Sequence, residues 1–227
     1  MSNSSIFVCQ QCGNEYSKWL GKCTACNSWN SLVETAQFTK GKKGTKSIRS
    51  IKGNESEIQK LTDIKASQMQ RISTGISELD RALGGGLVNG QVVLIAGEPG
   101  IGKSTLLLQL ANNLDKTLYI SGEESASQVG IRAQRLGIRN KNIDFLESTD
   151  VDSIIVSLLI INPQPLAIII DSIQTMSTTD LTGLAGSVGQ VRECAFRLLK
   201  FAKSKNIPLI LVGHVTKEGT VAGPAVL

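Results

Sequence analysis

The 227-residue chain has 41% hydrophobic and 19% charged residues, which is typical of a globular protein with one or two domains and a sizeable core. Its apolar runs do not exceed five residues, the length of the run from Leu166 to Ile170, and this excludes a membrane-spanning helix. The formal net charge of +5 is compatible with a nucleic-acid partner but does not decide the partner. The N-terminus lacks a basic segment followed by an apolar one, which predicts that there is no signal peptide and that the protein is cytoplasmic.

Four cysteines near the N-terminus follow the pattern C-x2-C, ten residues, C-x2-C, and they are Cys9, Cys12, Cys23 and Cys26. Each pair places two thiolates on a tight turn, and two such turns complete a tetrahedral site for Zn²⁺. Disulfides suit a cytosolic protein poorly, and a redox C-x-x-C motif does not need two copies. We therefore predict a zinc ribbon over residues 1–34 whose folding depends on the metal.

The two tryptophans, Trp19 and Trp29, flank the second cysteine pair. They either pack over the metal site or present a surface for base stacking or a partner contact. Residues 35–70 then lack periodicity and are rich in Gly, Ser and Thr, which predicts a flexible basic linker. Six basic side chains fall within thirteen residues without one acid: Lys40, Lys42, Lys43, Lys46, Arg49 and Lys52. This tether is either simply solvated or makes transient contact with phosphates.

Strands and helices alternate from residue 71 onward. The apolar patterns predict helices over 76–83, from 103, and over 128–136, 151–161 and 188–203, and strands over 92–96, 116–120, 142–146, 166–171 and 207–212. This alternation predicts an α/β fold with a mostly parallel, doubly wound sheet. Ligands of such sheets lie at the carboxyl ends of the strands.

A glycine-rich turn joins the first of these strands to the second helix. It has the pattern G-x-x-x-x-G-K-S and comprises Gly97, Glu98, Pro99, Gly100, Ile101, Gly102, Lys103, Ser104 and Thr105. Glycines let consecutive backbone N–H groups curl around an anion, and the N-terminus of the helix is directed at the same phosphates. Lys103 is expected to reach the β- and γ-phosphates, and the Ser104 hydroxyl to bind Mg²⁺. The turn therefore predicts binding of a nucleoside triphosphate such as ATP.

Three further side chains are predicted to share this end of the sheet. Asp171 ends a buried strand and is the expected second holder of the Mg²⁺ hydration shell. Glu123 and Glu124 follow the neighbouring strand, and we favour Glu123 as the carboxylate that orients and deprotonates the attacking water. The alternative is that Glu123 and Glu124 are both ordinary loop residues without a catalytic role. His214 is either structural or a sensor of the γ-phosphate. Residues 175–187 are expected to form a mobile loop beside them.

Several motifs accompany the phosphate loop and the cysteine ribbon. They lie at residues 74–87, 119–125, 170–175, 186–194 and 214–219. Together they resemble the RadA (Sms) family of bacterial DNA repair proteins, which are RecA-superfamily ATPases. The resemblance covers nearly all of the chain and implies that residues 71–227 form a RecA-like P-loop core.

The resemblance also implies an activity, cofactors and partners. The activity is DNA-dependent ATP hydrolysis in recombinational repair, with binding of single-stranded DNA and promotion of branch migration by a protein resembling a ring helicase. The cofactors are ATP, Mg²⁺ and Zn²⁺. The partners are single-stranded and branched DNA, a recombinase filament or replication proteins, and further copies of the protein in a hexameric ring. Lys103, Glu123 and His214 fall at catalytic positions, and the loops 175–187 and 216–227 face DNA.

The chain departs from the family in two respects. Family members continue past the position of residue 227 with a Lys- and Arg-containing motif and a domain resembling that of Lon proteases, so the resemblance implies a C-terminally truncated core. Ala225 stands where a basic residue is expected in the second DNA-facing loop. We therefore predict nucleotide binding with weak hydrolysis for this chain.

Two other classes of function fit parts of the sequence. A RecA-like ATPase that acts on protein partners, of the clock or signalling type, also suits the Glu123-Glu124 pair. A P-loop kinase needs a substrate pocket and lid, and no arginine-rich lid is evident. The zinc ribbon and the basic linker favour the nucleic-acid function over both.

Overall fold

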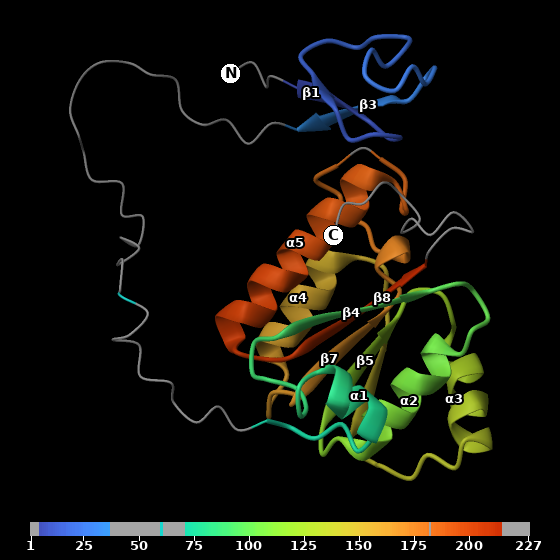
Figure 1. Cartoon of the computed structure of the whole chain (residues 1–227), viewed down its shortest axis with the longest axis vertical. Helices are drawn as coiled ribbons and strands as arrows, with labels where there is room; N and C mark the ends of the chain where they lie inside the picture. The colour runs from blue at the N-terminus through green and yellow to red at the C-terminus, as the bar shows by residue number, and fades with distance from the viewer. Residues whose placement is uncertain (1–4, 37–59, 61–70, 182, 215–227) are drawn as a thin grey trace.

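Two separate β-sheets organise the chain in the computed structural model, which describes residues 5–36, 60, 71–181 and 183–214 (Figure 1). The smaller sheet has the order β2-β1-β3, with β1 at Ser5–Cys9, β2 at Glu15–Tyr16 and β3 at Leu32–Ala36. Both pairings are antiparallel. Because β3 pairs with β1 as far as Ala36, the ribbon extends two residues beyond the predicted boundary at residue 34.

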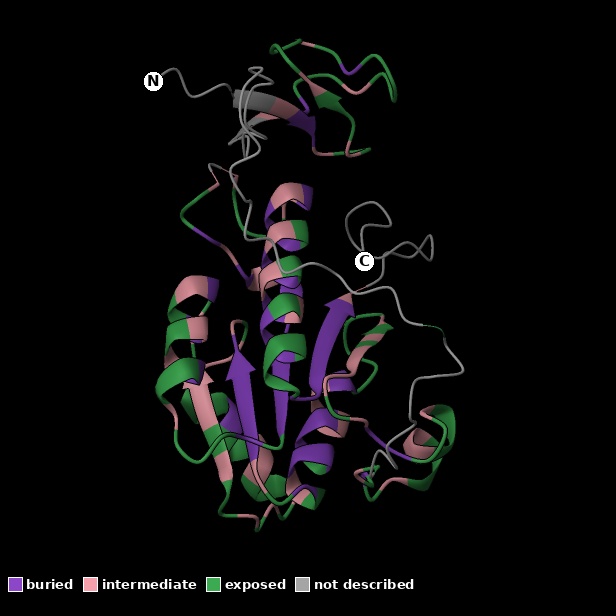
Figure 2. Ribbon diagram, turned by 90° about the vertical axis from the view of Figure 1, so that its left-hand side faces the viewer, coloured by how far each residue is buried: buried purple, intermediate pink, exposed green. Residues whose placement is uncertain are grey.

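The larger sheet has five parallel strands in the order β4-β8-β7-β5-β6. Its strands are β4 (Val92–Gly97), β5 (Thr117–Ser121), β6 (Ile143–Glu147), β7 (Ala167–Asp171) and β8 (Leu209–His214). The three inner strands are buried along nearly their whole length, as the purple arrows of Figure 2 show. Burial on both faces explains why these strands are continuous apolar runs rather than alternating ones.

Helices cover both faces of this sheet, which confirms the predicted α/β, doubly wound architecture. They are α1 (Ser77–Ala82), α2 (Lys103–Asn113), α3 (Ala126–Arg135), α4 (Val151–Ile160) and α5 (Val188–Lys205), with the short 3₁₀ helix η2 at Ile173–Thr175. Side chains of α4 and α5 pack against one face and those of α2 and α3 against the other. Each apolar face of the sheet therefore has its own helical cover.

The element bounds differ from the predicted ones by a few residues, for local reasons. Helix α3 begins earlier because Ser125 caps it, with Gln128 completing a reciprocal capping box. Helix α5 continues to Lys205 and ends where Asn206 takes the left-handed conformation, at φ 60°. Strand β8 begins after Pro208, which has no N–H to donate to a neighbouring strand.

Part of the segment between η2 and α5, for which the sequence predicts a mobile loop over 175–187, is hydrogen-bonded to α5. Gln190, only 1% exposed, accepts a hydrogen bond from the Thr178 N–H at 2.8 Å. Its amide nitrogen lies 3.0, 3.1 and 2.9 Å from the carbonyl oxygens of Thr178, Leu181 and Gly183. One side chain of α5 thus holds the loop backbone at Thr178, Leu181 and Gly183.

Some predicted features lie outside the described residues. These are most of the linker over 35–70, the second DNA-facing loop at 216–227 and Ala225 within it. Within the part of the chain that the structure describes, no helix is long and apolar enough to cross a membrane.

Candidate nucleotide site and metal centre

The phosphate loop runs from the end of β4 into the first turn of α2, as predicted. Gly100 and Gly102 have φ angles of +81° and +103°, values that residues with a Cβ rarely adopt. A Cβ at either position would have no atom within 4 Å, so these glycines serve the backbone conformation and not close packing. The loop therefore keeps open space beside backbone that is curved for binding an anion.

Lys103 lies within this curved loop, with only 8% of its surface exposed. Its ammonium group donates hydrogen bonds to the carbonyl oxygens of Gly97 and Glu98, each at 2.8 Å. Ser104 follows it in the first turn of α2 and is partly exposed. The cation and the hydroxyl are thus held at the helix N-terminus, where phosphate and its metal bind in nucleotide sites.

Strand register brings the predicted site residues together from distant parts of the sequence. Gly97 at the end of β4 pairs with His214 at the end of β8, and Ser121 at the end of β5 pairs with Asp171 at the end of β7. Because the strands are parallel, these four positions share the carboxyl edge of the sheet.

Glu123 is the centre of a polar cluster at this edge. Its Oε1 accepts a hydrogen bond from the Ser172 hydroxyl and lies 2.8 Å from Nε2 of His214. Burial raises the pKa of the Glu123 carboxyl, but the hydrogen bonds from Ser172 and His214, and the charges of His214 and Lys103, bring it below its ordinary value. Glu123 is therefore an ionised carboxylate at neutral pH and is electrostatically linked to the phosphate-loop lysine.

Glu124, the other candidate acid, is used differently. Its Oε1 lies 2.5 Å from Nη2 of Arg132 on α3, in an ion pair whose two side chains are 23% and 27% exposed. The hydrogen bond from Arg132 to Glu124 raises the pKa of the guanidinium. Of the two adjacent acids, Glu123 is therefore the one that contacts His214.

Asp171 is 5% exposed, and its Oδ2 accepts a 2.6 Å hydrogen bond from the hydroxyl of Tyr119 on β5. Sequence reasoning missed Tyr119, and it missed Ser172 as a partner of Glu123. Strand alternation predicts that Tyr119 and Ser121 share one face of β5, but only the strand register of the structure shows that Ser121 pairs with Asp171. For Ser172, the sequence indicates a place in the site only through its position directly after Asp171 at the end of β7.

These residues fit a nucleotide with Mg²⁺. The Ser104 hydroxyl and the Asp171 carboxylate are hard oxygen donors of the kind that Mg²⁺ prefers. Lys103 and the helix N-terminus supply positive charge for the phosphates. The donor set therefore suits a magnesium-bound triphosphate.

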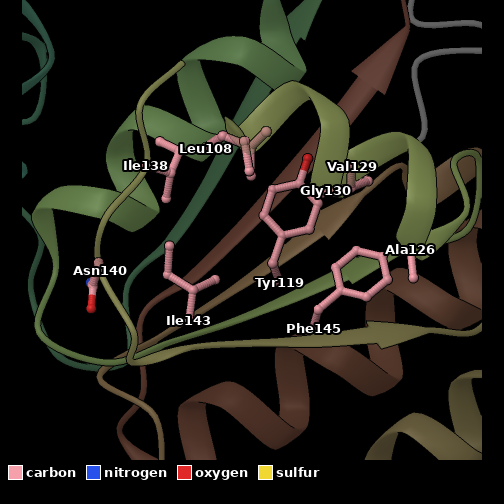
Figure 3. Close-up of a pocket in the computed structure, with 10 residues that line it drawn as sticks. Leu108, Tyr119, Ala126, Val129, Gly130, Ile138, Asn140, Ile143 and Phe145 are labelled. Carbon is pink, nitrogen blue, oxygen red and sulfur yellow. The ribbon is translucent and has the colours of Figure 1, made fainter. Parts of the chain in front are cut away.

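A pocket of about 290 Å³ lies on the face of the large sheet that α2 and α3 cover (Figure 3). Its ten lining residues come from α2, β5, α3, β6 and the connection between α3 and β6, and they include Leu108, Tyr119, Val129 and Phe145. None of the residues Gly97 to Thr105 lines it. The pocket is apolar and therefore does not match the chemistry of phosphate binding.

The four predicted zinc ligands form a second centre in the ribbon. The sulfur atoms of Cys9, Cys12, Cys23 and Cys26 all lie within 4.8 Å of one another. The Cys9–Cys26 and Cys12–Cys23 sulfur pairs are 3.6 and 3.5 Å apart. A tetrahedral site with zinc–sulfur bonds of about 2.3 Å has sulfur separations of about 3.8 Å. The four thiols are thus already arranged for a single Zn²⁺.

The side chains of Tyr16 and Ser31 form hydrogen bonds with two of the cysteine sulfur atoms. The Tyr16 hydroxyl lies 3.2 Å from the sulfur of Cys23, and this hydrogen bond lowers the pKa of the Cys23 thiol to about 6. Cys9 lies 3.3 Å from the Ser31 hydroxyl. A thiolate is the form that binds zinc. The pKa of the Cys23 thiol is lowered, whereas the pKa of the Cys12 thiol, which a backbone hydrogen bond lowers, is raised to about 12 by burial and by hydrogen bonds with the other cysteines. The arrangement of the four sulfur atoms is therefore what indicates the zinc site.

The tryptophans of the ribbon do not pack over this centre. Trp19 and Trp29 are 55% and 73% exposed, and the buried cluster around the cysteines contains Leu32 with Phe7 and Tyr16 beside it. The ammonium of Lys22 lies 5.6 Å from the centre of the Trp29 ring. Their exposure agrees with the second interpretation of the tryptophans, in which they present a surface for base stacking or a partner contact.

Comparisons with known proteins match both parts of the chain. Residues 72–158 match the ATPase family described as KaiC, and residues 7–34 match a zinc ribbon described as a rubredoxin metal binding domain. Among curated proteins, DNA repair protein RadA of Aquifex aeolicus is 46% identical over 228 residues, which cover 99% of this chain and 49% of that protein.

RadA proteins from other bacteria match this chain to a similar extent. DNA repair protein RadA of Bacillus subtilis is 46% identical over 98% of this chain and 49% of its own length, and that of Escherichia coli is 45% identical over 97% and 49%. The chain therefore spans about half the length of the curated relatives that it matches.

Proposed function

Because the chain belongs to the RadA family of DNA repair proteins, we propose that it binds and hydrolyses ATP as the motor part of a DNA repair ATPase. The observation that carries this proposal is the cluster at the carboxyl edge of the sheet, where His214 contacts Glu123, the charge of Lys103 acts on the same carboxylate, and Asp171 ends the neighbouring strand. In this proposal the zinc ribbon, predicted over 1–34, extends to the end of β3 at Ala36, the linker follows it up to residue 70, and residues 71–227 form the core.

Each side chain has a separate role in the proposed reaction. The N–H groups of residues 97–105 and the Lys103 ammonium bind the β- and γ-phosphates, while Ser104 and Asp171 hold Mg²⁺. The metal neutralises charge on the phosphate oxygens when it is bound. Glu123 orients a water molecule toward the γ-phosphorus and takes its proton as the bond to the β-phosphate oxygen breaks. ADP and inorganic phosphate are the products.

His214 links this chemistry to the rest of the molecule. Its Nε2 contacts Glu123, and its backbone oxygen lies 3.4 Å from the amide nitrogen of Gln174 in η2, which precedes the loop at 176–187. We assign His214 the role of γ-phosphate sensor, because this one residue contacts both Glu123 and Gln174 of η2. The loop that follows η2 is the proposed DNA-facing element.

We further propose that the full-length protein acts on single-stranded and branched DNA, promotes branch migration and assembles as a hexameric ring in the cytoplasm. Its expected protein partners are a recombinase filament or replication proteins. The names of the relatives support DNA repair as the process. The exposed tryptophans and Lys22 of the ribbon add a surface on which bases or a partner can stack.

ATP binding and ATPase assays test this proposal on two proteins in parallel, this chain and full-length RadA from Bacillus subtilis. We expect ATP binding with slow turnover for this chain. For the full-length relative we expect stimulation by single-stranded DNA that falls steeply as salt rises, because phosphate contacts release counterions. Lys103→Ala is the control, since it removes a cation–phosphate contact of about 1.5–3 kcal/mol and weakens ATP binding by at least about tenfold.

Two outcomes would contradict the proposal. If this chain binds no ATP, the nucleotide assignment is wrong. If the full-length relative hydrolyses ATP without any response to DNA at low salt, the alternative RecA-like ATPase that acts on protein partners is favoured. The match to the KaiC description over residues 72–158 is the observation that keeps this alternative in view.

A further inference from the structure

Tyr119 is a polar side chain in the interior whose role the proposed reaction leaves unassigned. It lies at the centre of β5 and is 1% exposed. Its only described hydrogen bond is the one from its hydroxyl to Oδ2 of Asp171, at 2.6 Å. A buried hydroxyl that lacks a partner is costly, so this contact constrains both residues.

The direction of the hydrogen bond follows from the chemistry of the two groups. A phenol has an ordinary pKa of about 10 and is neutral at pH 7, whereas a carboxylate only accepts hydrogen bonds. Tyr119 is therefore the donor and Oδ2 of Asp171 the acceptor. A hydrogen bond to a charged acceptor is short and strong, and the 2.6 Å separation here is short. One oxygen of Asp171 is thereby occupied, and the other oxygen remains for the metal or its water.

The ring of Tyr119 is held by its own surroundings. It stacks on Phe145 of β6, with ring centres 6.2 Å apart and an angle of 19° between the ring planes. Leu108 of α2 and Val129 of α3 line the same pocket, so apolar side chains surround the ring (Figure 3). The hydroxyl is thus presented to Asp171 from a fixed position.

We propose that Tyr119 is a positioning residue for magnesium: it fixes the Asp171 carboxylate so that one oxygen is always directed to the metal of the bound nucleotide. The proposal rests on the proposed nucleotide function. Partners that orient a metal-holding carboxylate commonly change metal affinity by about 10- to 100-fold when they are removed. Tyr119 acts through Asp171, so its loss is expected to change the response to Mg²⁺ and not the binding of the phosphates by Lys103.

Tyr119→Phe tests this proposal, because it removes one oxygen and keeps the ring in its pocket. Binding of a non-hydrolysable ATP analogue is measured in a Mg²⁺ titration and again in EDTA. We expect the Mg²⁺ concentration needed for half-maximal effect to rise about tenfold, with unchanged affinity in EDTA. Ile138→Val is the matched control: it alters the wall of the same pocket without removing a polar atom or the ring that stacks on Tyr119, and its Mg²⁺ response is expected to equal that of the unchanged chain.

The results separate this proposal from the proposed function. If the unchanged chain binds no nucleotide, both fail. If it binds with a clear Mg²⁺ effect and Tyr119→Phe shows the same Mg²⁺ response, or loses affinity equally in EDTA, only the role of Tyr119 is overturned.

A second measurement needs no substitution. The chain has two tyrosines, Tyr16 in the ribbon and Tyr119, so labelling tyrosine with carbon-13 at Cζ produces two NMR signals. We expect Mg²⁺ to shift the Tyr119 signal of the nucleotide-bound protein while the Tyr16 signal stays in place. A Tyr119 signal that does not respond to Mg²⁺ would overturn the proposal even if Tyr119→Phe failed to fold.

Discussion

At the scale of single residues, neighbouring side chains of one type have different environments and therefore different chemistry. Glu123 shares Oε1 between Ser172 and His214, whereas Glu124 pairs with Arg132. Both are glutamates on one short turn. The contacts of each side chain, and not its residue type, select Glu123 as the candidate for activating water.

Glu123→Gln is expected to bind ATP normally and to lose turnover by about 10²- to 10⁴-fold, because an amide of the same size cannot accept the proton of the attacking water. ATP affinity and steady-state hydrolysis are measured on the same preparation. Glu124→Gln is the matched control, and there we expect the loss to appear in folding stability, since Arg132 is left with a weaker partner. Full turnover in Glu123→Gln would remove this residue from the catalytic role.

At the scale of elements, α5 organises the loop beside the nucleotide site through two polar side chains. Gln190 holds the loop backbone at Thr178, Leu181 and Gly183. Arg197 lies 2.5 Å from Asp152 of α4, 2.6 Å from Asp180 of the loop and 2.8 Å from Glu193 of α5. A helix that packs on the sheet thereby also fixes the geometry of a proposed DNA-facing segment.

Gln190→Ala is expected to lower the free energy of unfolding by about 1–3 kcal/mol, because buried loop amide and carbonyl groups lose their partner. Urea unfolding measures the loss, and limited proteolysis is expected to show new cleavage between residues 178 and 187. Lys200→Ala, an exposed position on the same helix, serves as the control and should leave both readouts unchanged. Equal proteolysis of the two variants would show that Gln190 does not anchor the loop.

The Arg197 cluster predicts a specific dependence of stability on pH. Burial raises the pKa of Asp152, but hydrogen bonds from Thr178 and Arg197 bring it below its ordinary value of 3.8. Since the folded state binds this proton less tightly than the unfolded state, the contribution to stability is present above pH 3.8 and is lost as pH falls through the lowered folded-state value.

Arg197→Met should therefore be less stable than the unchanged chain at pH 7, with a difference that narrows as pH falls below the ordinary value of 3.8. Urea unfolding at a series of pH values provides the comparison. A stability difference that stays constant down to the lowest pH would mean that Arg197 stabilises the fold by packing and not by charge.

At the scale of the whole molecule, the ribbon and the core have separate sheets and separate buried clusters. Among the ribbon residues whose burial the structure describes, the buried cluster has three members, two of which are metal-site cysteines. Such a small core does not hold a fold by apolar burial alone, so the metal is expected to supply the folding free energy.

Removal of zinc by a strong chelator is expected to unfold the ribbon and leave ATP binding by the core intact. Thiol titration under native conditions provides the count: four cysteines should become reactive, while Cys194 stays protected in the core. Cys194 is fully buried, and burial raises the pKa of its thiol to about 12. Loss of ATP binding together with zinc would show that the two parts are coupled.

The sequence by itself determined the features that depend on local spacing. The C-x2-C pairs, the phosphate loop with Lys103 and Ser104, and the alternation that predicts a parallel α/β sheet are each encoded within a short stretch of chain. The structure confirmed these elements with bounds that moved by a few residues. The four cysteines and the carboxyl edge of the sheet are where the spacing placed them.

Only the tertiary structure decided the contacts between distant segments. Tyr119 meets Asp171 across 52 residues, Ser172 meets Glu123 across 49, and His214 meets Glu123 across 91. The exposure of Trp19 and Trp29 likewise follows from the ribbon fold. These contacts depend on strand register and side-chain direction, which no local pattern encodes, because residues that meet across a parallel sheet are separated by whole helical connections.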